Sequence, residues 1–212
     1  MAPFAMQLAS SLVHGLFNTQ LLKHGNDIAV AANGILMSVM SLIFMCVVSV
    51  NMAVQPIIGF NYGAKQYDRV RLTLFKSIKI ASLIAVGGFF IAQIFPGAIV
   101  KMFNTADREL FNIGVRGIRI AMAMSVLSGF QIVVGSYYQS TGKAKLAMLL
   151  SLLRQVIILI PLLLIFPNYF GLDGVWLSMP VADFISAVVV FFFFKHELSK
   201  LNQLVDSQEK LL

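Results

Sequence analysis

The chain has 212 residues, of which 58% are hydrophobic and only 12% charged, and its mean hydropathy is +0.85. A soluble globular domain of this size would need a far more polar surface, so that class is excluded. The net charge of +7 does not indicate nucleic-acid binding, because the basic residues lie in the short gaps between apolar runs. The single cysteine, Cys46, lies inside an apolar run and is interpreted as a small hydrophobic residue rather than a disulfide or metal ligand.

Six stretches are long and apolar enough to span a membrane, which needs about 20 such residues. None alternates strictly between apolar and polar positions, so all six are predicted to be helices. The predicted spans are residues 3–22, 28–58, 72–95, 114–138, 146–166 and 172–194. We therefore predict an all-α integral membrane protein, with a six-helix transmembrane bundle in residues 1–198 and a cytoplasmic polar tail at 199–212.

The basic residues between the predicted spans fall mainly on alternate gaps. These gaps contain Lys65, Arg69, Arg71, Lys143, Lys145, Lys195 and Lys200. Because cytoplasmic loops carry the excess of Lys and Arg, this pattern predicts six spans with a cytoplasmic C-terminus. The first span begins at residue 3 without a cytoplasmic lead-in, and we expect the chain to be cut from something longer.

A polar, glycine-containing segment ends the second predicted span. It contains Gln55, Pro56, Gly59, Asn61 and Gly63, directly before Lys65. Proline lacks a backbone donor and glycine allows close approach of helices, so this segment is interpreted as the cytoplasmic exit of a helix. A similar order of residue types in 131–143 ends the fourth span, which indicates a repeated transporter element or the tendency of any helix exit to collect Gly and Lys.

These motifs resemble the multidrug and toxic compound extrusion (MATE) transporters, especially their bacterial efflux branch. The resemblance is carried by residues 55–64, 68–70, 138–145, 151–155, 174–177 and 180–183. It covers nearly the whole chain but only the C-terminal half of the family's twelve-helix architecture. It implies one lobe of an antiporter in the bacterial inner (plasma) membrane, exporting small cationic or amphipathic compounds in exchange for Na⁺ or H⁺, without another cofactor. The implied partners are the lipid bilayer and the missing N-terminal lobe or a second copy, with no nucleic acid.

Three titratable residues deep within the predicted spans are candidates for function, because charge in a membrane span is costly and usually functional. Asp183 is the only acid deep in a span, and it is a candidate for binding the coupling ion or a cationic substrate. Arg154 lies at a similar depth in the preceding span, so a structural ion pair between the two is the competing interpretation. His14 is a candidate proton carrier, although a histidine packed between helices is the commoner case.

Uncharged polar residues within the spans are candidates for lining a substrate cavity. We select Gln7, Asn33, Gln131 and Gln155, while noting that such side chains often bond across helices without a transport role. Some members of the resembling family place an acidic cation site on the first and fourth helices of this lobe. In this chain the first predicted span offers Gln7 and His14, and the fourth offers no acid.

No enzyme is predicted, because the sequence has no phosphate-binding loop, no metal-ligand spacing and no nucleophile–base pair. Two alternatives to an efflux antiporter remain. A lipid-linked oligosaccharide flippase of similar architecture would require several cationic residues in its cavity. A truncated, non-transporting membrane subunit would use its inward polar residues for helix packing alone.

Overall fold

The computed structural model describes the backbone of residues 2–103 and 107–209, and this part of the chain is helical, with no strand. The elements in chain order are α1 (Ala2–Gly63), α2 (Tyr67–Ile94), α3 (Pro96–Phe103), α4 (Arg108–Ala121), η1 (Ser125–Leu127), α5 (Ser128–Ser140), α6 (Ala144–Leu152), η2 (Leu153–Leu159) and α7 (Ile160–Glu209). The prediction of an all-α protein is confirmed.

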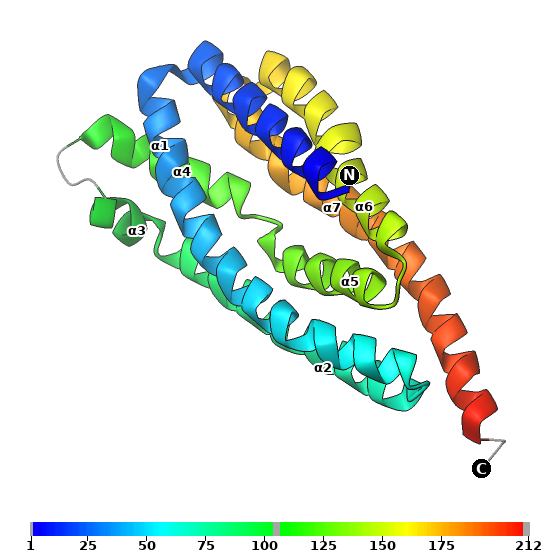
Figure 1. Cartoon of the computed structure of the whole chain (residues 1–212). Helices are drawn as coiled ribbons and strands as arrows, with labels where there is room; N and C mark the ends of the chain where they lie inside the picture. Colours follow the sequence, from blue (N-terminus) through cyan, green and yellow to red (C-terminus); the bar gives the residue numbers. More distant parts are fainter. Residues whose placement is uncertain (1, 104–106, 210–212) are drawn as a thin grey trace.

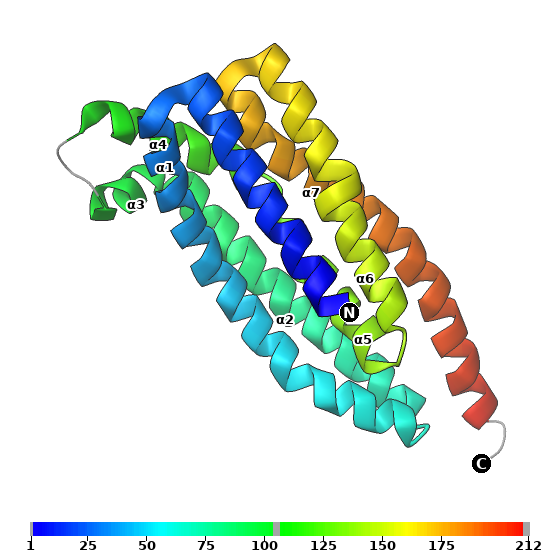
Figure 2. The ribbon, with the colours of Figure 1, turned by 45° about the horizontal axis from the view of Figure 1, so that its top comes forward.

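Two of these helices fold back on themselves (Figures 1 and 2). At 1.5 Å per residue, the 62 residues of α1 would extend about 90 Å, three times the hydrocarbon thickness of a bilayer. A left-handed residue breaks each of them: Asn26 in α1, with φ of 65°, and Gly171 in α7, with φ of 58°. The Asn26 side chain accepts bonds from the backbone N–H groups of Ile28 (2.9 Å) and Ala29 (3.4 Å), which caps the second arm.

The described helices therefore provide six membrane-length segments. The stretches Gln7–Gly63, Tyr67–Ile94 and Ala144–Gln208 are long and apolar enough to cross a membrane, as is the pair Arg108–Ala121 and Ser125–Ser140, bent by 45°. Because the first and third of these each contain two arms, the total matches the predicted six-helix lobe.

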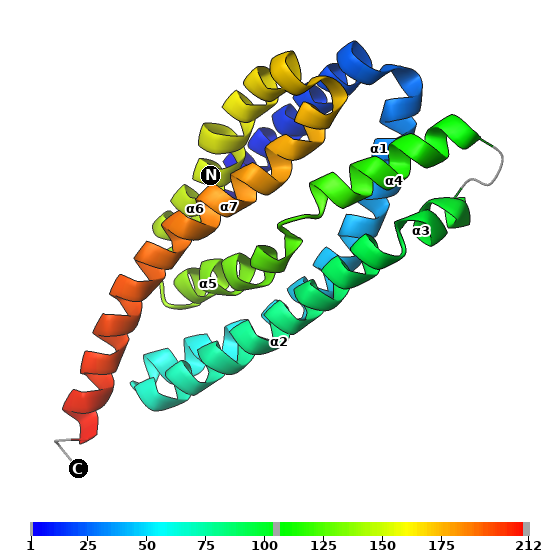
Figure 3. The ribbon, with the colours of Figure 1, turned by 180° about the vertical axis from the view of Figure 1, so that it is seen from behind.

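The connections between segments gather at two opposite ends (Figures 1 and 3). One end of the bundle holds the breaks within α1 and α7. The C-terminus of α3 and the N-terminus of α4 lie at the same end. The α1–α2 turn with Lys65, the α5–α6 turn with Lys143 and the last residues of α7 lie at the other end. The basic gaps singled out in the sequence thus share one end of the bundle.

The bend in the fourth segment is set by a close approach to α2. A Cβ atom added at Gly129, the second residue of α5, would lie 2.5 Å from the backbone oxygen of Ala81. No side chain fits in that space, so glycine is required where the chain turns from α4 into α5.

The two predicted cytoplasmic exits end in the same cap geometry. Lys65 and Gly142 both adopt left-handed conformations, with φ of 59° and 80°. In each, the next residue donates its N–H five positions back, from Gln66 to Asn61 and from Lys143 to Tyr138, both at 2.8 Å. The similar order of residue types in the two segments therefore corresponds to two helix caps with the same hydrogen-bond pattern to the last carbonyl groups.

The polar segment at the C-terminus is not separate from the last span. Helix α7 continues through Glu209, and the side chains of Leu201 and Val205 are only 2% exposed. These residues lie one turn apart on one face, so the amphipathic end of the helix packs against the bundle. Residues 210–212 of the expected tail lie outside the described part.

Candidate functional site

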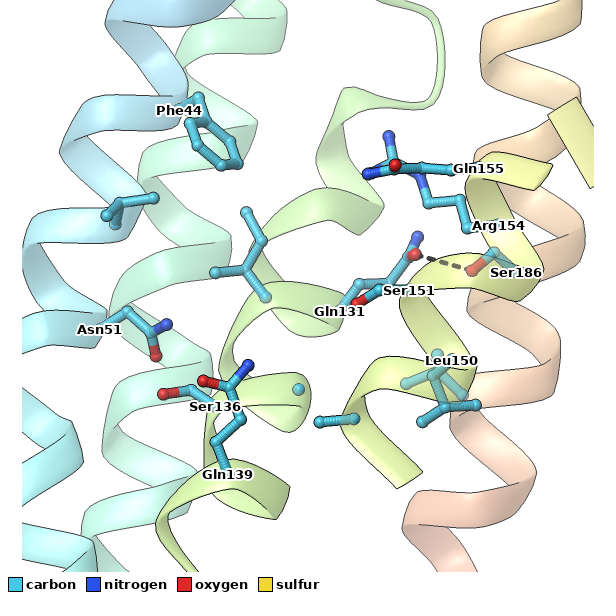
Figure 4. Close-up of a pocket in the computed structure, with 15 residues that line it drawn as sticks. Phe44, Asn51, Gln131, Ser136, Gln139, Leu150, Ser151, Arg154, Gln155 and Ser186 are labelled. Atoms are coloured by element: carbon cyan, nitrogen blue, oxygen red, sulfur yellow. Dashed lines mark hydrogen bonds between the residues drawn. The ribbon is translucent and has the colours of Figure 1, made fainter. Parts of the chain in front are cut away.

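A pocket of about 310 Å³ lies between the second arm of α1 and α5, α6, η2 and α7 (Figure 4). Polar side chains line it in two groups. One group comprises Asn51, Ser136 and Gln139. The other comprises Gln131, Ser151, Arg154, Gln155 and Ser186. The apolar lining is formed by Phe44, Val48, Ile132, Ala147, Leu150 and Val190.

Arg154 and Asp183 meet at the wall of this pocket. Nε of Arg154 donates to Oδ1 of Asp183 at 2.6 Å, and Nη2 of the same guanidinium lies 2.5 Å from that oxygen. The Asp183 side chain is 6% exposed and that of Arg154 is 40% exposed. The carboxylate is thus enclosed, while Arg154 borders the pocket.

Gln131 connects this pair to the neighbouring helix. Its Nε2 donates to the backbone oxygen of Asp183 at 3.0 Å, and its Oε1 accepts from the hydroxyl of Ser186 at 3.1 Å. Figure 4 shows Gln131 and Ser186 facing each other across α5 and α7. These two bonds set the orientation of the amide and hold α5 against α7 beside the ion pair.

A π-helical segment positions the two polar residues of the fifth span. Leu153–Leu159 forms η2, which contains Arg154 and Gln155, and both line the pocket. A π turn widens the helix and changes which side chains share a face, so consecutive residues reach one cavity. Such segments occur often at functional sites, and nothing in the residue pattern of the span predicts one.

Several polar atoms of the lining lack a partner. Among the described residues, Asn51 Oδ1, Ser136 Oγ and Gln155 Oε1 are buried and accept or donate no hydrogen bond. Buried polar atoms are normally paired, so these three groups have bonding capacity that the described part of the chain does not use. Asn51 and the serine residues were not selected from the sequence, since hydroxyl and amide groups within spans commonly serve packing.

The other candidates from the sequence lie outside this pocket. Gln7 and His14 are exposed on the first arm of α1. Asn33 is buried, at 6% exposure, and its Oδ1 has no hydrogen-bond partner in the described structure. Of the four predicted cavity residues, only Gln131 and Gln155 line the pocket.

The glycine-containing motif at the end of α1 forms part of a helix contact. A Cβ added at Gly59 would lie 3.5 Å from the backbone oxygen of Ser140, at the end of α5. The side chain of Asn61 is buried and donates to the backbone oxygen of Ile57 at 2.8 Å. Gln55 and Pro56 lie inside α1, which continues to Gly63 without a break at the proline. The motif therefore joins the two capped helix ends.

A second polar cluster occupies the end of the bundle near the C-terminus. Glu197 Oε1 pairs with Lys143 Nζ and accepts from the hydroxyl of Tyr137 at 3.3 Å. These residues border a pocket of about 470 Å³ that also includes Tyr62 and Lys200. Glu197 was not a candidate from the sequence because it lies beyond the last apolar run, where an acid is expected to face water.

An ion pair also lies at the opposite end of the bundle. Arg116 pairs with Asp173, which joins α4 to the second arm of α7. The arginine side chain is largely exposed, and exposed pairs of this kind contribute little to stability. This pair therefore connects two segments without forming a site.

The chain matches a known family of proteins over most of its length. The family model described as MatE matches residues 3–165. The chain belongs to the MatE family. Among curated proteins, it is 23% identical over 192 residues to the multidrug export protein MepA of Staphylococcus haemolyticus, covering 89% of this chain and 41% of that protein. It is 26% identical over 178 residues to MepA of Staphylococcus aureus, covering 82% and 38%.

Solved structures of MATE transporters share the fold. The MATE multidrug transporter DinF-BH is 41% identical, with a TM-score of 0.81, over 92% of this chain and 44% of that one. A MOP superfamily transporter from Pyrococcus furiosus has a TM-score of 0.85 at 19% identity, over 93% and 45%. The chain thus spans less than half the length of these MatE relatives, in agreement with a single lobe.

Proposed function

We propose that this MatE chain is the C-terminal lobe of a secondary multidrug efflux antiporter in the bacterial inner membrane, with its C-terminus in the cytoplasm. The observation that supports this most is the 41% identity to a MATE multidrug transporter across 92% of the chain. The lobe works with a second six-helix lobe or a second copy, since two lobes related by an axis along the membrane normal form such transporters. It exports small cationic or amphipathic compounds in exchange for Na⁺ or H⁺.

In this proposal the 310 Å³ pocket contributes to substrate binding. Its volume lies within the range of small-molecule sites, about 300–1,000 Å³. It also combines an apolar lining with a few polar groups, as such sites do. Because five helical segments supply the lining, a relative movement of α1 and α7 would change its shape and its affinity for substrate, as alternating access requires.

Within this mechanism Asp183 is the fixed partner of Arg154, and the coupling ion binds elsewhere in the complete transporter. Nε and Nη2 of the guanidinium both lie against one carboxylate oxygen, and the Asp183 side chain is 6% exposed. A coupling ion would have to displace the guanidinium from a buried charge, at a cost of several kcal/mol. The backbone oxygen of Asp183 also accepts from Gln131, and this bond holds this part of α7 against α5.

Dye efflux in an efflux-deficient bacterium tests the proposal. The chain is expressed alone and together with the first lobe of a MATE relative. We expect export only with the partner lobe, and collapse of export when the Na⁺ and H⁺ gradients are abolished. A folded lobe pair that exports no dye would argue against an efflux function.

One observation bears on the flippase alternative. Among the described lining residues of the pocket, Arg154 is the one charged side chain, whereas a cavity for lipid-linked oligosaccharides needs several cationic residues for its phosphates. The same efflux experiment distinguishes a truncated, non-transporting subunit from an antiporter lobe, because such a subunit would not restore export with any partner lobe.

A further inference from the structure

The pocket of about 470 Å³ lies at the end of the bundle that carries the Lys65 and Lys143 turns. It is lined by the ends of α1 and α5, by the α5–α6 turn and by the part of α7 from Glu197 to Ser207. Tyr62, Lys143 and Glu197 each follow the end of a predicted span by a few residues. The pocket therefore lies where the bundle leaves the hydrocarbon of the membrane, at the level of the lipid head groups.

The one acid among the described lining residues of this pocket already has partners. Oε1 of Glu197 pairs with Nζ of Lys143 and accepts from the hydroxyl of Tyr137 at 3.3 Å. The Glu197 side chain is 10% exposed, whereas that of Lys143 is 35% exposed. An ammonium group has three donors, so Lys143 keeps donors for a ligand while the carboxylate is largely enclosed.

Lys200 adds a second positive charge to the pocket. Its side chain is exposed, and no other described residue forms an ion pair or a hydrogen bond with it. The two lysines exceed the one carboxylate, so the lining keeps a net positive charge, and Gln203 and Ser207 add neutral donors. A phosphate group matches this set, because its charged oxygens accept hydrogen bonds from ammonium, amide and hydroxyl groups.

Exposed apolar surface of α7 adjoins the pocket on its membrane side. Val189, Phe193 and Lys200 follow one another at intervals of four and seven residues, which places them along one face of the helix. The Phe193 side chain is 40% exposed and lies near the end of the last apolar run, while Lys200 borders the pocket. A ligand bound by its phosphate at Lys200 therefore has an apolar surface beside it in the direction of the bilayer.

We propose that this pocket binds the phosphate head group of an anionic phospholipid, with Lys143 and Lys200 as its ligands and an acyl chain along α7 at Phe193. Basic pockets between helices at the membrane boundary suit such head groups. Because the two lysines belong to the α5–α6 turn and to α7, one phosphate held by both joins these segments. The inference goes beyond the proposed function, since it assigns a lipid to a site separate from the 310 Å³ pocket.

Native mass spectrometry of the purified full chain in detergent tests the site. Phosphatidylglycerol is compared with phosphatidylcholine that has the same acyl chains and whose phosphate charge is compensated by choline. We expect the first phosphatidylglycerol molecule to bind about tenfold more tightly, the effect of one charge-assisted hydrogen bond. Equal binding of the two lipids would overturn the proposal.

Variants of one exposed lysine assign the preference to the pocket. Lys200→Gln should reduce the preference to about twofold, because it removes one of the two phosphate ligands, and Lys200→Arg should keep it. Lys145→Gln is the matched control, since Lys145 is an exposed lysine of the same end outside the pocket lining, and it should leave the preference unchanged. Equal losses in the Lys200→Gln and Lys145→Gln variants would mean that the basic end attracts anionic lipids as a whole, which contradicts a site in the pocket.

Competition distinguishes a lipid from a soluble phosphate compound. Glycerol phosphate has the phosphate without acyl chains, and we expect it to displace phosphatidylglycerol far less well than the unlabelled lipid does. Displacement as effective as that by the lipid would assign the pocket to soluble phosphates and contradict the lipid proposal. Dye efflux plays no part in this measurement, so a lobe pair that binds the lipid without exporting dye contradicts the proposed function alone.

Discussion

At the scale of single residues, the energetic cost of breaking the Arg154–Asp183 pair depends on which of the two charges remains. The carboxylate is the enclosed member and the guanidinium the exposed one. Removing the arginine therefore leaves a buried charge without compensation, whereas removing the carboxylate leaves a cation that can turn toward the open pocket. The two single substitutions are not equivalent, although they break the same contact.

We expect Arg154→Gln to destabilise the protein by about 3 kcal/mol and Asp183→Asn by less, since breaking a buried pair is most costly where the remaining charge is buried. The double variant should recover most of the loss. Thermal unfolding of the purified protein in detergent measures all three. Equal losses for the two single variants would contradict the unequal burial of the two charges, and an additive loss in the double variant would show that the pair is not energetically coupled.

At the scale of elements, the contact of α5 with α2 requires a glycine at position 129. The space at Gly129 is closed by the backbone of Ala81, which cannot move without moving α2. The bend between α4 and α5 therefore places Gln131, two residues further on, at the pocket.

Substitution of Gly129 by valine should separate α5 from α2 and destabilise the fold by at least about 2 kcal/mol, as overpacking does in closely packed cores. Gly87→Ala in α2 is a control, because no neighbouring atom lies within 4 Å of its added Cβ, and it should be neutral or slightly stabilising. Thermal unfolding gives the comparison. Comparable stability of the two variants would mean that α5 can shift to make room.

The end of α7 is held to the α5–α6 turn by Glu197, which pairs with Lys143 and accepts from Tyr137. Glu197→Gln removes the charge but keeps an acceptor for the tyrosine. We expect faster amide hydrogen exchange in residues 198–209 and unchanged exchange in the membrane-spanning part, because local opening is governed by local contacts. Unchanged exchange throughout would indicate that the packing of Leu201 and Val205 is sufficient.

At the scale of the whole molecule, two opposite ends are defined by where the helices turn. The Lys65 and Lys143 turns and the end of α7 share one end, and Asn26 and Gly171 lie at the other. The positive-inside rule then predicts which end faces the cytoplasm.

Single cysteines in a Cys46→Ala background test this orientation. In intact cells, a membrane-impermeant maleimide should label Asp27→Cys and leave Lys65→Cys and Ser207→Cys unlabelled until the membrane is opened. All three positions are exposed at helix ends. Labelling of the Lys65 and Ser207 positions in intact cells would invert the proposed topology.

The sequence by itself determined the all-α class, the six segments and their alternation, because hydropathy over about 20 residues and the position of lysines are local properties. It also indicated the family, through motifs that run in order along the chain. It identified Gln131, Gln155, Arg154 and Asp183 as costly polar groups in apolar surroundings, since any such group in a span requires a partner.

The sequence offered the Arg154–Asp183 pair as one of two interpretations, and only the tertiary structure decided that these two side chains meet and which other groups join them. The pocket takes residues from five elements, with Asn51 and Ser186 separated by 135 positions in the chain, and no local pattern reports such a distance. The π segment at Arg154, the bend before Gly129 and the enclosed position of Glu197 are likewise set by packing against other helices. The charge that faces the pocket follows from which member of an ion pair is buried, and burial is a property of the assembled bundle.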